Sequence, residues 1–131
     1  METQMQSEPV TTRTAKLWLG TDGILRKIFL NNADETLQDA LESEEVIKRL
    51  SGDKKRPILV DFTALHSMDV AARDYYISDR AGSLLAACGG VTHSMIGRVI
   101  SNFFIGFNKP PTPVKLFKTE EESIEWLKQF V

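Results

Sequence analysis

Two aspartates and a histidine lie close together in the middle of the chain, where a predicted strand leads into a predicted helix. Asp61 ends the apolar run that begins at Ile58, and Asp69 precedes a helix expected from about Val70. Paired carboxylates act as general acid and base when burial or a neighbour shifts one pKa, and His66 between them is a further candidate for acid–base chemistry. The simpler interpretation, which we favour, is that Asp69 caps the helix, Asp61 binds loop amides and His66 faces solvent.

A second candidate pair is Cys88 and His93. A nucleophilic thiol needs exposure and an electropositive neighbour, whereas Cys88 ends an apolar run, so we expect it to be buried and inert. The chain has one cysteine and two histidines, which is a poor basis for a zinc site. The sequence therefore predicts no catalytic residue, no metal site and no cofactor.

Glycines precede a possible helix start after Cys88. Gly89-Gly90 leads to a helix expected to begin with a cap at Ser94, and Gly97 and Arg98 follow. Free amides at such a start bind anions, and Arg98 would add positive charge. The pattern matches neither the dinucleotide fingerprint nor a P-loop, and we favour an ordinary turn.

The most apolar exposed candidate is a phenylalanine-rich segment. Phe103, Phe104, Ile105 and Phe107 lie within five positions and are followed by Pro110. One helix face cannot bury them all, because three successive residues span about 200° of a helix. Three interpretations stay open: a core segment, a homodimer surface, or the mouth of a site for a lipid or other apolar ligand.

The elements that position these residues begin with a hairpin. Residues 1–13 are polar and aperiodic, and we expect a disordered lead-in before one domain over residues 14–131. Strands Lys16–Leu19 and Ile24–Leu30 should pair antiparallel across the Asp22-Gly23 turn.

Helices and strands then alternate. The first expected helix runs from a cap at Asp34 to about Leu50, with a stop at Ser51-Gly52. A strand Ile58–Phe62, a helix Val70–Arg80 and a strand Leu84–Cys88, ended by Gly89-Gly90, follow. The last elements are a helix from Ser94 through Phe104, a strand Val114–Phe117 and a final helix capped by Thr119. This order predicts an α/β domain with one mixed sheet of about five strands and about four helices.

Composition narrows the functional classes. The 131 residues are 42% apolar and 26% charged, with a net charge of −2. That balance gives no reason to expect a nucleic acid as partner. A single cysteine fits a reducing compartment, and we find no secretory signal and no stretch long enough to cross a membrane. We expect a cytoplasmic protein.

The segment Asp61-Phe-Thr-Ala-Leu, with Asp69 eight residues after Asp61, resembles the STAS domain, the SpoIIAA-like fold of anti-sigma-factor antagonists. The similarity covers roughly residues 15–131. It is greatest to a small stand-alone bacterial branch of unknown function, through Trp18 to Ile24 and Ala72-Arg73. A stretch like Asn102–Pro110 also precedes the last strand in that branch.

One departure bears directly on function. Antagonists of this family carry Ser-Ser after the second aspartate, and a kinase phosphorylates one of these serines. Val70-Ala71 stand there in this chain and have no hydroxyl group, so the family's phospho-switch is not expected at this position. Ser67 is the only local substitute.

The resemblance and the lack of catalytic motifs predict a non-enzymatic regulatory or protein-interaction module that self-associates, as a homodimer, through the Phe103–Pro111 region. The alternative is a carrier or sensor of a small apolar or anionic ligand, lipid-like, because related superfamily architectures include CRAL-TRIO lipid carriers. An enzyme using Asp61, Asp69 and His66 would require these side chains to converge in one cleft.

Overall fold

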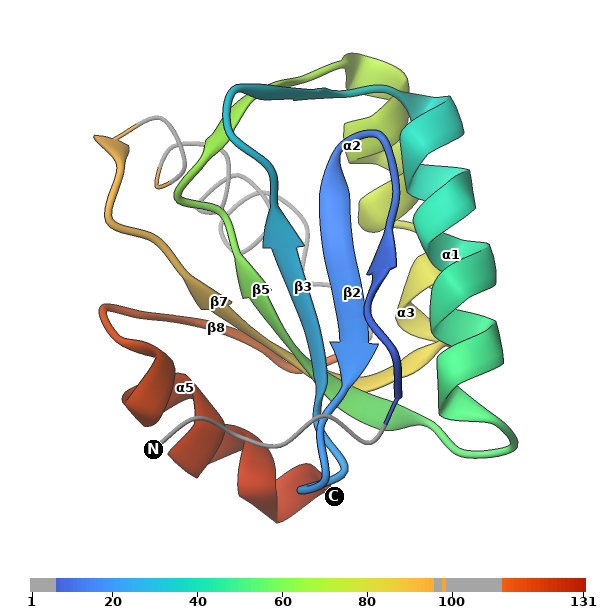
Figure 1. Cartoon of the computed structure of the whole chain (residues 1–131), viewed down its shortest axis with the longest axis vertical. Helices are drawn as coiled ribbons and strands as arrows, with labels where there is room; N and C mark the ends of the chain where they lie inside the picture. The colour runs from blue at the N-terminus through green and yellow to red at the C-terminus, as the bar shows by residue number, and fades with distance from the viewer. Residues whose placement is uncertain (1–6, 96–97, 99–111) are drawn as a thin grey trace.

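The structure is a computed structural model that describes residues 7–95, 98 and 112–131 (Figure 1). Its first long strands form a hairpin, because an Asp-Gly turn reverses the chain between two apolar runs. Gly23 has a φ of 82°, which glycine adopts without steric cost. Strand β2 (Ala15–Leu19) pairs antiparallel with β3 (Leu25–Phe29), so the predicted hairpin is confirmed.

Ordered structure begins before the hairpin. Strand β1 (Val10–Thr11) pairs antiparallel with β2, and the Leu19 amide donates a hydrogen bond of 2.9 Å to Ser7 Oγ. The predicted disordered lead-in over residues 1–13 is therefore wrong at Val10 and Thr11, which form β1. The open edge of β2 offers backbone partners that even a short polar segment can use, and composition does not reveal such pairing.

Three parallel strands extend the sheet beyond β3. They are β5 (Arg56–Asp61), β7 (Leu85–Val91) and β8 (Val114–Phe117), and they give the order β1-β2-β3-β5-β7-β8. Residues 57–60 are all buried, as expected for a strand covered on both faces. The described residues thus form an α/β fold with four α-helices and a mixed sheet of six strands, one more than the approximate number predicted.

A small second sheet was not predicted. Strands β4 (Ala33–Glu35) and β6 (Leu65–Met68) pair in parallel. The predicted helix cap at Asp34 is wrong, because Asp34 lies in β4 and Thr36 caps α1 (Leu37–Ser51). The Thr36 and Asp39 side chains each accept a hydrogen bond from the other's amide, which forms a capping box. The later helix start leaves Glu35 in a strand, with its side chain buried.

The predicted helix from Val70 to Arg80 is two helices, α2 (Val70–Tyr76) and α3 (Asp79–Gly82). Ser78 interrupts it, because its hydroxyl accepts a hydrogen bond from the Ala81 amide and so starts a new helix. Helix α3 then leads directly to the start of β7 at Leu85, where the chain enters the sheet again.

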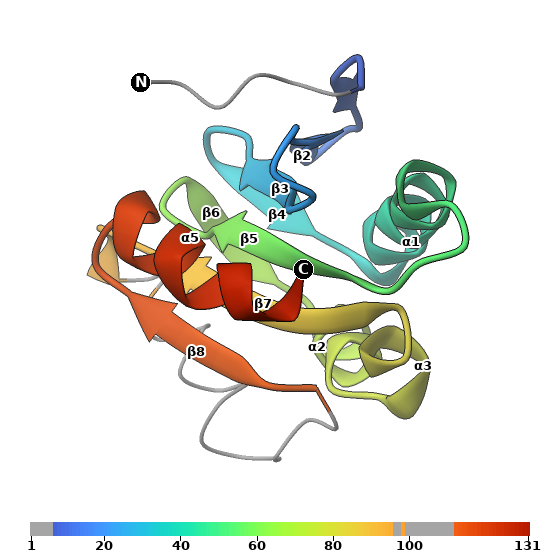
Figure 2. The ribbon, with the colours of Figure 1, turned by 90° about the horizontal axis from the view of Figure 1, so that it is seen from below.

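Helices cover both faces of the main sheet. Figure 2 shows α1, α2 and α3 on one side and α5 (Glu120–Leu127) on the other. The larger core cluster lies on the α1 side and includes Val46 and Ile47 of that helix. The smaller cluster contains Leu127 of α5. Thr119 caps α5 as predicted, because its hydroxyl accepts a hydrogen bond from the Glu122 amide.

Strand β7 passes through both glycines that were expected to end it. A Cβ on Gly89 would lie 2.3 Å from Ser123 Oγ of α5, and a Cβ on Gly90 would lie 2.8 Å from Leu116 Cδ2 of β8. The glycines therefore permit close packing around the strand and do not form a turn. Of the helix expected from Ser94 through Phe104, the structure describes only Ser94, 95 and 98.

Candidate functional site

A pocket lies between the main sheet and the helices α1 to α3. Its volume is about 110 Å³ and its walls are almost entirely apolar. Alternate residues of each strand face it, and the small residues Cys88 and Gly90 of β7 leave space that larger side chains would fill. The described lining residues are Lys27, Phe29, Ile47, Ile58, Val60, Phe62, Met68, Tyr76, Ile77, Ala81, Gly82, Leu85, Cys88, Gly90, Thr112, Val114 and Leu116.

Lys27 is the one charged side chain among these described lining residues, and it is only 3% exposed. Its ammonium group donates a hydrogen bond of 2.7 Å to the Tyr76 hydroxyl and lies 3.5 Å from Glu35 Oε2. The Tyr76 hydroxyl in turn donates to Glu35 Oε2 at 2.5 Å. Thr14 Oγ1 donates to the other carboxylate oxygen at 2.5 Å. We call Lys27, Glu35, Tyr76 and Thr14 the buried polar cluster.

The electrostatics of this cluster depend on its burial. Removal from water lowers the pKa of Lys27, and the Glu35 carboxylate opposes that shift. Burial raises the pKa of Tyr76, and Glu35 raises it further. The ring centroids of Phe29 and Tyr76 lie 4.8 and 4.9 Å from the ammonium nitrogen, within the range of cation–π attraction. The cluster places a lysine at the wall of a largely apolar pocket, with Glu35 outside the lining.

A second polar group holds the helices over the pocket. The Glu44 carboxylate of α1 is 1% exposed. It accepts hydrogen bonds of 2.9 and 2.6 Å from Arg80 of α3 and one of 2.7 Å from the Tyr75 hydroxyl of α2. The guanidinium and the hydroxyl lower the pKa of Glu44 against the effect of its burial. Two further lining residues of the pocket are also joined, because Thr112 Oγ1 donates a hydrogen bond of 2.6 Å to the Gly82 carbonyl.

The strand-to-helix junction has mainly capping contacts. Asp69 caps α2 by accepting a hydrogen bond from the Ala72 amide at 2.8 Å, and Asp61 accepts one from the Thr63 amide at 2.9 Å. These are the interpretations that we favoured from the sequence.

His66 and Ser67 are both joined to Asp34 on the surface. His66 Nδ1 lies 2.8 Å from Asp34 Oδ1, and Ser67 Oγ donates to the same oxygen at 2.5 Å. Both side chains therefore contact the carboxylate directly. In a hydrolase triad the histidine lies between the serine and the carboxylate, so these three residues do not have the arrangement of a triad.

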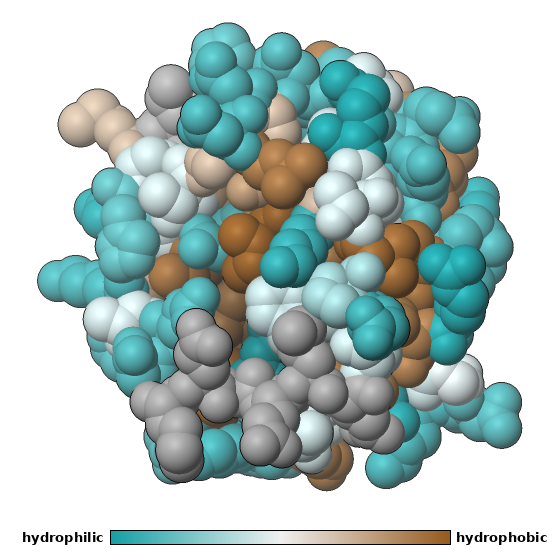
Figure 3. All heavy atoms as spheres, in the orientation of Figure 1, coloured by the Kyte–Doolittle hydropathy of each residue, from teal (hydrophilic) through white to brown (hydrophobic). Residues whose placement is uncertain are grey.

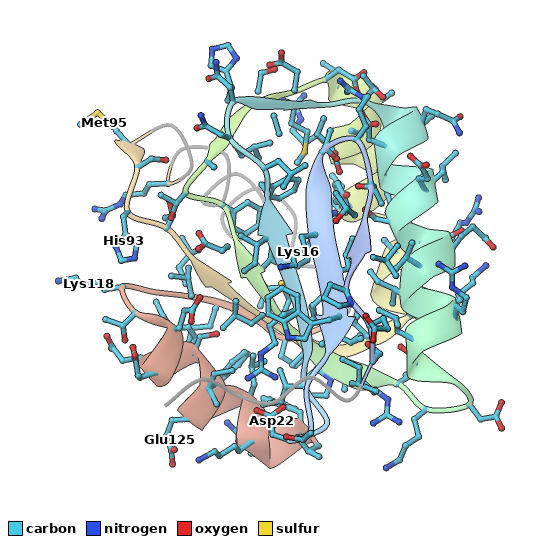
Figure 4. All side chains as sticks on the ribbon, in the orientation of Figure 1. Lys16, Asp22, His93, Met95, Lys118 and Glu125 are labelled. Atoms are coloured by element: carbon cyan, nitrogen blue, oxygen red, sulfur yellow. The ribbon has the colours of Figure 1, made fainter. Side chains whose placement is uncertain are left out.

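The cysteine lines the pocket. Burial raises the pKa of the Cys88 thiol to about 12, so it is protonated at neutral pH. His93 is exposed at the edge of the molecule (Figure 4) and follows the end of the strand that holds Cys88. In the described part of the chain, no cluster of histidine, cysteine and carboxylate side chains has the grouping of a metal site.

Gly89 and Gly90 form neither the anion-binding loop that was the alternative nor the ordinary turn that we favoured from the sequence. Gly89 and Gly90 pair with both neighbouring strands within β7, and so they offer no glycine loop. Arg98 is exposed. The other candidates for an interaction surface, Phe103, Phe104, Phe107 and Pro110, lie outside the described residues.

The buried polar cluster was not predicted from the sequence. Lys27 lies on the same face of β3 as Leu25 and Phe29, and these two residues are buried. A charged residue in phase with two inward-facing apolar residues is the signal that could have drawn attention to it. Glu35 and Tyr76 carried no comparable signal, because their contacts depend on β4 and on the packing of α2.

Figure 3 shows one face of the molecule, where hydrophobic residues form several patches with hydrophilic residues between them. None of the helices in the described ranges is long and apolar enough to span a membrane.

Comparison with solved structures supports the fold. An uncharacterised protein of the DUF3478 family from Shewanella loihica PV-4, described as having a SpoIIAA-like fold, matches with a TM-score of 0.56 at 14% identity, over 97% of this chain and 96% of that one. A protein of unknown function from Arthrobacter sp. FB24 is 31% identical over 90% of this chain and 95% of that one, with a TM-score of 0.33. The SpoIIAA-like fold predicted from the sequence is confirmed by the first.

A search of curated proteins gave no match. Residues 17–131 match a family described as a domain of unknown function, DUF7793. That range includes every strand of the pocket wall and all four described helices. The chain therefore belongs to the DUF7793 family and has a SpoIIAA-like fold.

Proposed function

We propose that this protein is a carrier or sensor that binds a small apolar molecule in the pocket between the sheet and helices α1 to α3. The observation that carries the proposal is the pocket itself, a space of about 110 Å³ with almost entirely apolar walls. Protein interiors are packed with few voids larger than a water molecule. An apolar space of this size costs stability when empty, and occupation by a ligand recovers lost contacts.

The volume limits the ligand. An apolar cavity of about 150 Å³ accepts benzene, and the pocket here is of the same order. A drug-sized or long-chain lipid ligand needs roughly 300–1,000 Å³. The lipid-like ligand considered from the sequence is therefore replaced by a smaller one of about the size of toluene.

A titration with toluene, followed by two-dimensional amide NMR, tests this proposal. We expect shifts to concentrate on the described lining residues of β5, β7 and β8. The amides around Leu127, on the α5 side of the sheet, should stay unchanged. Shifts spread evenly over the surface, or none up to saturation with toluene, would reject the proposal.

A matched pair of variants gives the control. Val114→Phe adds a ring to a residue of β8 that lines the pocket. Lys115→Phe adds the same ring to the next residue of that strand, whose side chain lies on the opposite face. Toluene binding should be lost in Val114→Phe and retained in Lys115→Phe, with circular dichroism confirming that both variants fold.

The self-associating regulatory module remains a separate hypothesis from the sequence. Its surface, Phe103 to Pro111, lies outside the described residues, so no contact of the structure supports it. Light scattering during size-exclusion chromatography tests it directly, and a strict monomer at tens of micromolar would reject self-association.

A further inference from the structure

The geometry points to a ligand that is electrically neutral and carries an acceptor oxygen, such as a carbonyl group, which receives a hydrogen bond from Lys27. This inference deepens the proposed function and rests on it. Its basis is the buried polar cluster at the pocket wall, where a lysine lines the cavity and its counter-charge lies outside the lining.

Charge balance excludes an anion as the preferred ligand. Lys27 is already paired with Glu35, whose carboxylate also accepts hydrogen bonds from Tyr76 and Thr14. The pair has zero net charge whether the shared proton lies on the nitrogen or on the carboxylate. A ligand carboxylate would make the buried site negative, and an uncompensated charge in an apolar environment is strongly disfavoured.

The hydrogen-bond inventory favours an acceptor. An ammonium group has three N–H donors, and the contacts found in the described residues use one toward Tyr76 and one toward Glu35. The Tyr76 hydroxyl gives its own proton to Glu35, so it is not the donor for a ligand. Lys27 therefore has a remaining N–H for a ligand oxygen in a pocket with few other polar groups.

A hydrocarbon would bind less well than its size permits. It would leave the remaining N–H of Lys27 with only the aromatic contacts described above, and a ring face is a weaker partner for a buried donor than an acceptor oxygen. A neutral carbonyl compound would accept a hydrogen bond from the nitrogen while the rest of the ligand covers the apolar wall. One molecule thus supplies both an acceptor for the Lys27 N–H and apolar surface against the pocket wall.

Three probes of equal shape separate these possibilities: 2,2,3-trimethylbutane, pinacolone and pivalate. They have the same number of non-hydrogen atoms as toluene and differ in oxygen and charge only. At neutral pH we expect the wild type to bind pinacolone roughly tenfold more tightly than pivalate. Amide NMR titration gives the dissociation constants.

Two variants test the role of Lys27. The double variant Lys27→Met/Glu35→Gln removes both charges while keeping similar volumes, and we expect it to lose roughly tenfold in pinacolone affinity but not in trimethylbutane affinity. The single variant Glu35→Gln leaves the ammonium without a counter-charge, so its preference should reverse toward pivalate. Circular dichroism checks the fold, and the double variant decides the matter if Glu35→Gln does not fold.

The outcomes distinguish this inference from the proposed function. If toluene fails to bind the wild type, the proposed function itself is wrong. If toluene binds but pivalate equals pinacolone, pinacolone does not bind, or the double variant keeps wild-type affinity for pinacolone, only the inference is overturned. Reversal toward pivalate in Glu35→Gln, together with the tenfold loss in the double variant, supports it.

Discussion

The Lys27 ammonium group of β3 lies 2.7 Å from the Tyr76 hydroxyl of α2, so a hydrogen bond joins the central sheet to a helix at the wall of the pocket. Glu35 of β4 completes the contact by accepting the hydroxyl proton. Three elements thus meet at one buried polar point beside a space of about 110 Å³. Stability and ligand preference should both depend on it.

Substitution of Lys27 alone should be costly. Lys27→Met leaves the Glu35 carboxylate buried without its cation, and we expect a loss of about 3 kcal/mol in the free energy of unfolding. The double variant Lys27→Met/Glu35→Gln should recover most of that loss, because no buried charge remains. Urea unfolding measures both variants. Equal destabilisation by the single and double variants would contradict a coupled pair.

Acid should weaken the start of α1. Arg13 is the main cause that lowers the pKa of Asp39 from 3.8 to about 2, and the Thr36 amide and hydroxyl contribute. Because the folded-state pKa is below the unfolded value, this stabilisation is complete above about pH 4 and disappears as the pH falls toward 2. Asp39→Asn and Arg13→Met should both reduce the loss of stability in that window, as measured by urea unfolding at several pH values.

Thr36→Ala separates the cap from the ion pair. It removes the hydroxyl that accepts from the Asp39 amide but keeps Arg13, so we expect a cost of about 1 kcal/mol with most of the acid dependence retained. An unchanged acid dependence in Asp39→Asn would show that other carboxylates cause it.

Cys88 should react slowly with thiol reagents in the folded protein. Burial raises the pKa of its thiol to about 12, which leaves little thiolate at pH 8, and the half-buried side chain faces the pocket. We expect labelling by iodoacetamide to be at least about a hundredfold slower than in urea-unfolded protein, and slower still with toluene present. Mass spectrometry follows the reaction. Equal rates in folded and unfolded protein would place the thiol at the surface.

Gly89 should tolerate no side chain. A Cβ at this position would lie 2.3 Å from Ser123 Oγ and 3.1 Å from Leu127 Cδ1, so Gly89→Ala should cost about 1–3 kcal/mol through overpacking against α5. Ser123→Ala in the same chain removes the nearer atom and should recover part of the loss. Additive effects in this double-mutant cycle, measured by thermal unfolding, would mean that the two residues do not collide.

Much of the fold follows from local sequence patterns. The hairpin, the strands from Ile58 and Val114 and the caps at Asp69 and Thr119 have strong signals, because turn glycines, apolar runs and capping residues act within a few positions. Strands β4 and β6 were missed for the opposite reason. They are short, and each is stabilised by pairing with a segment about thirty residues away.

The site was harder to predict than the fold. Gly89-Gly90 has the sequence pattern of a turn, yet these glycines lie within β7 and permit the close approach of Ser123 and Leu116 to that strand. Lys27 is visible as a charge in phase with buried residues, but its partners come from β4 and α2. A pocket forms from side-chain volumes that meet across several elements, and no pattern along one segment records them.

The most direct test of the pocket as a binding site is the measurement of intermolecular nuclear Overhauser effects between toluene and the methyl groups of the protein. If toluene enters the pocket, its ring protons should show these effects with Ile47, Val60 and Leu85, which line it. The methyl groups of Leu127, on the other face of the sheet, should show none. Contacts with Leu127 or with surface methyl groups, and none with the three lining residues, would contradict the proposed function.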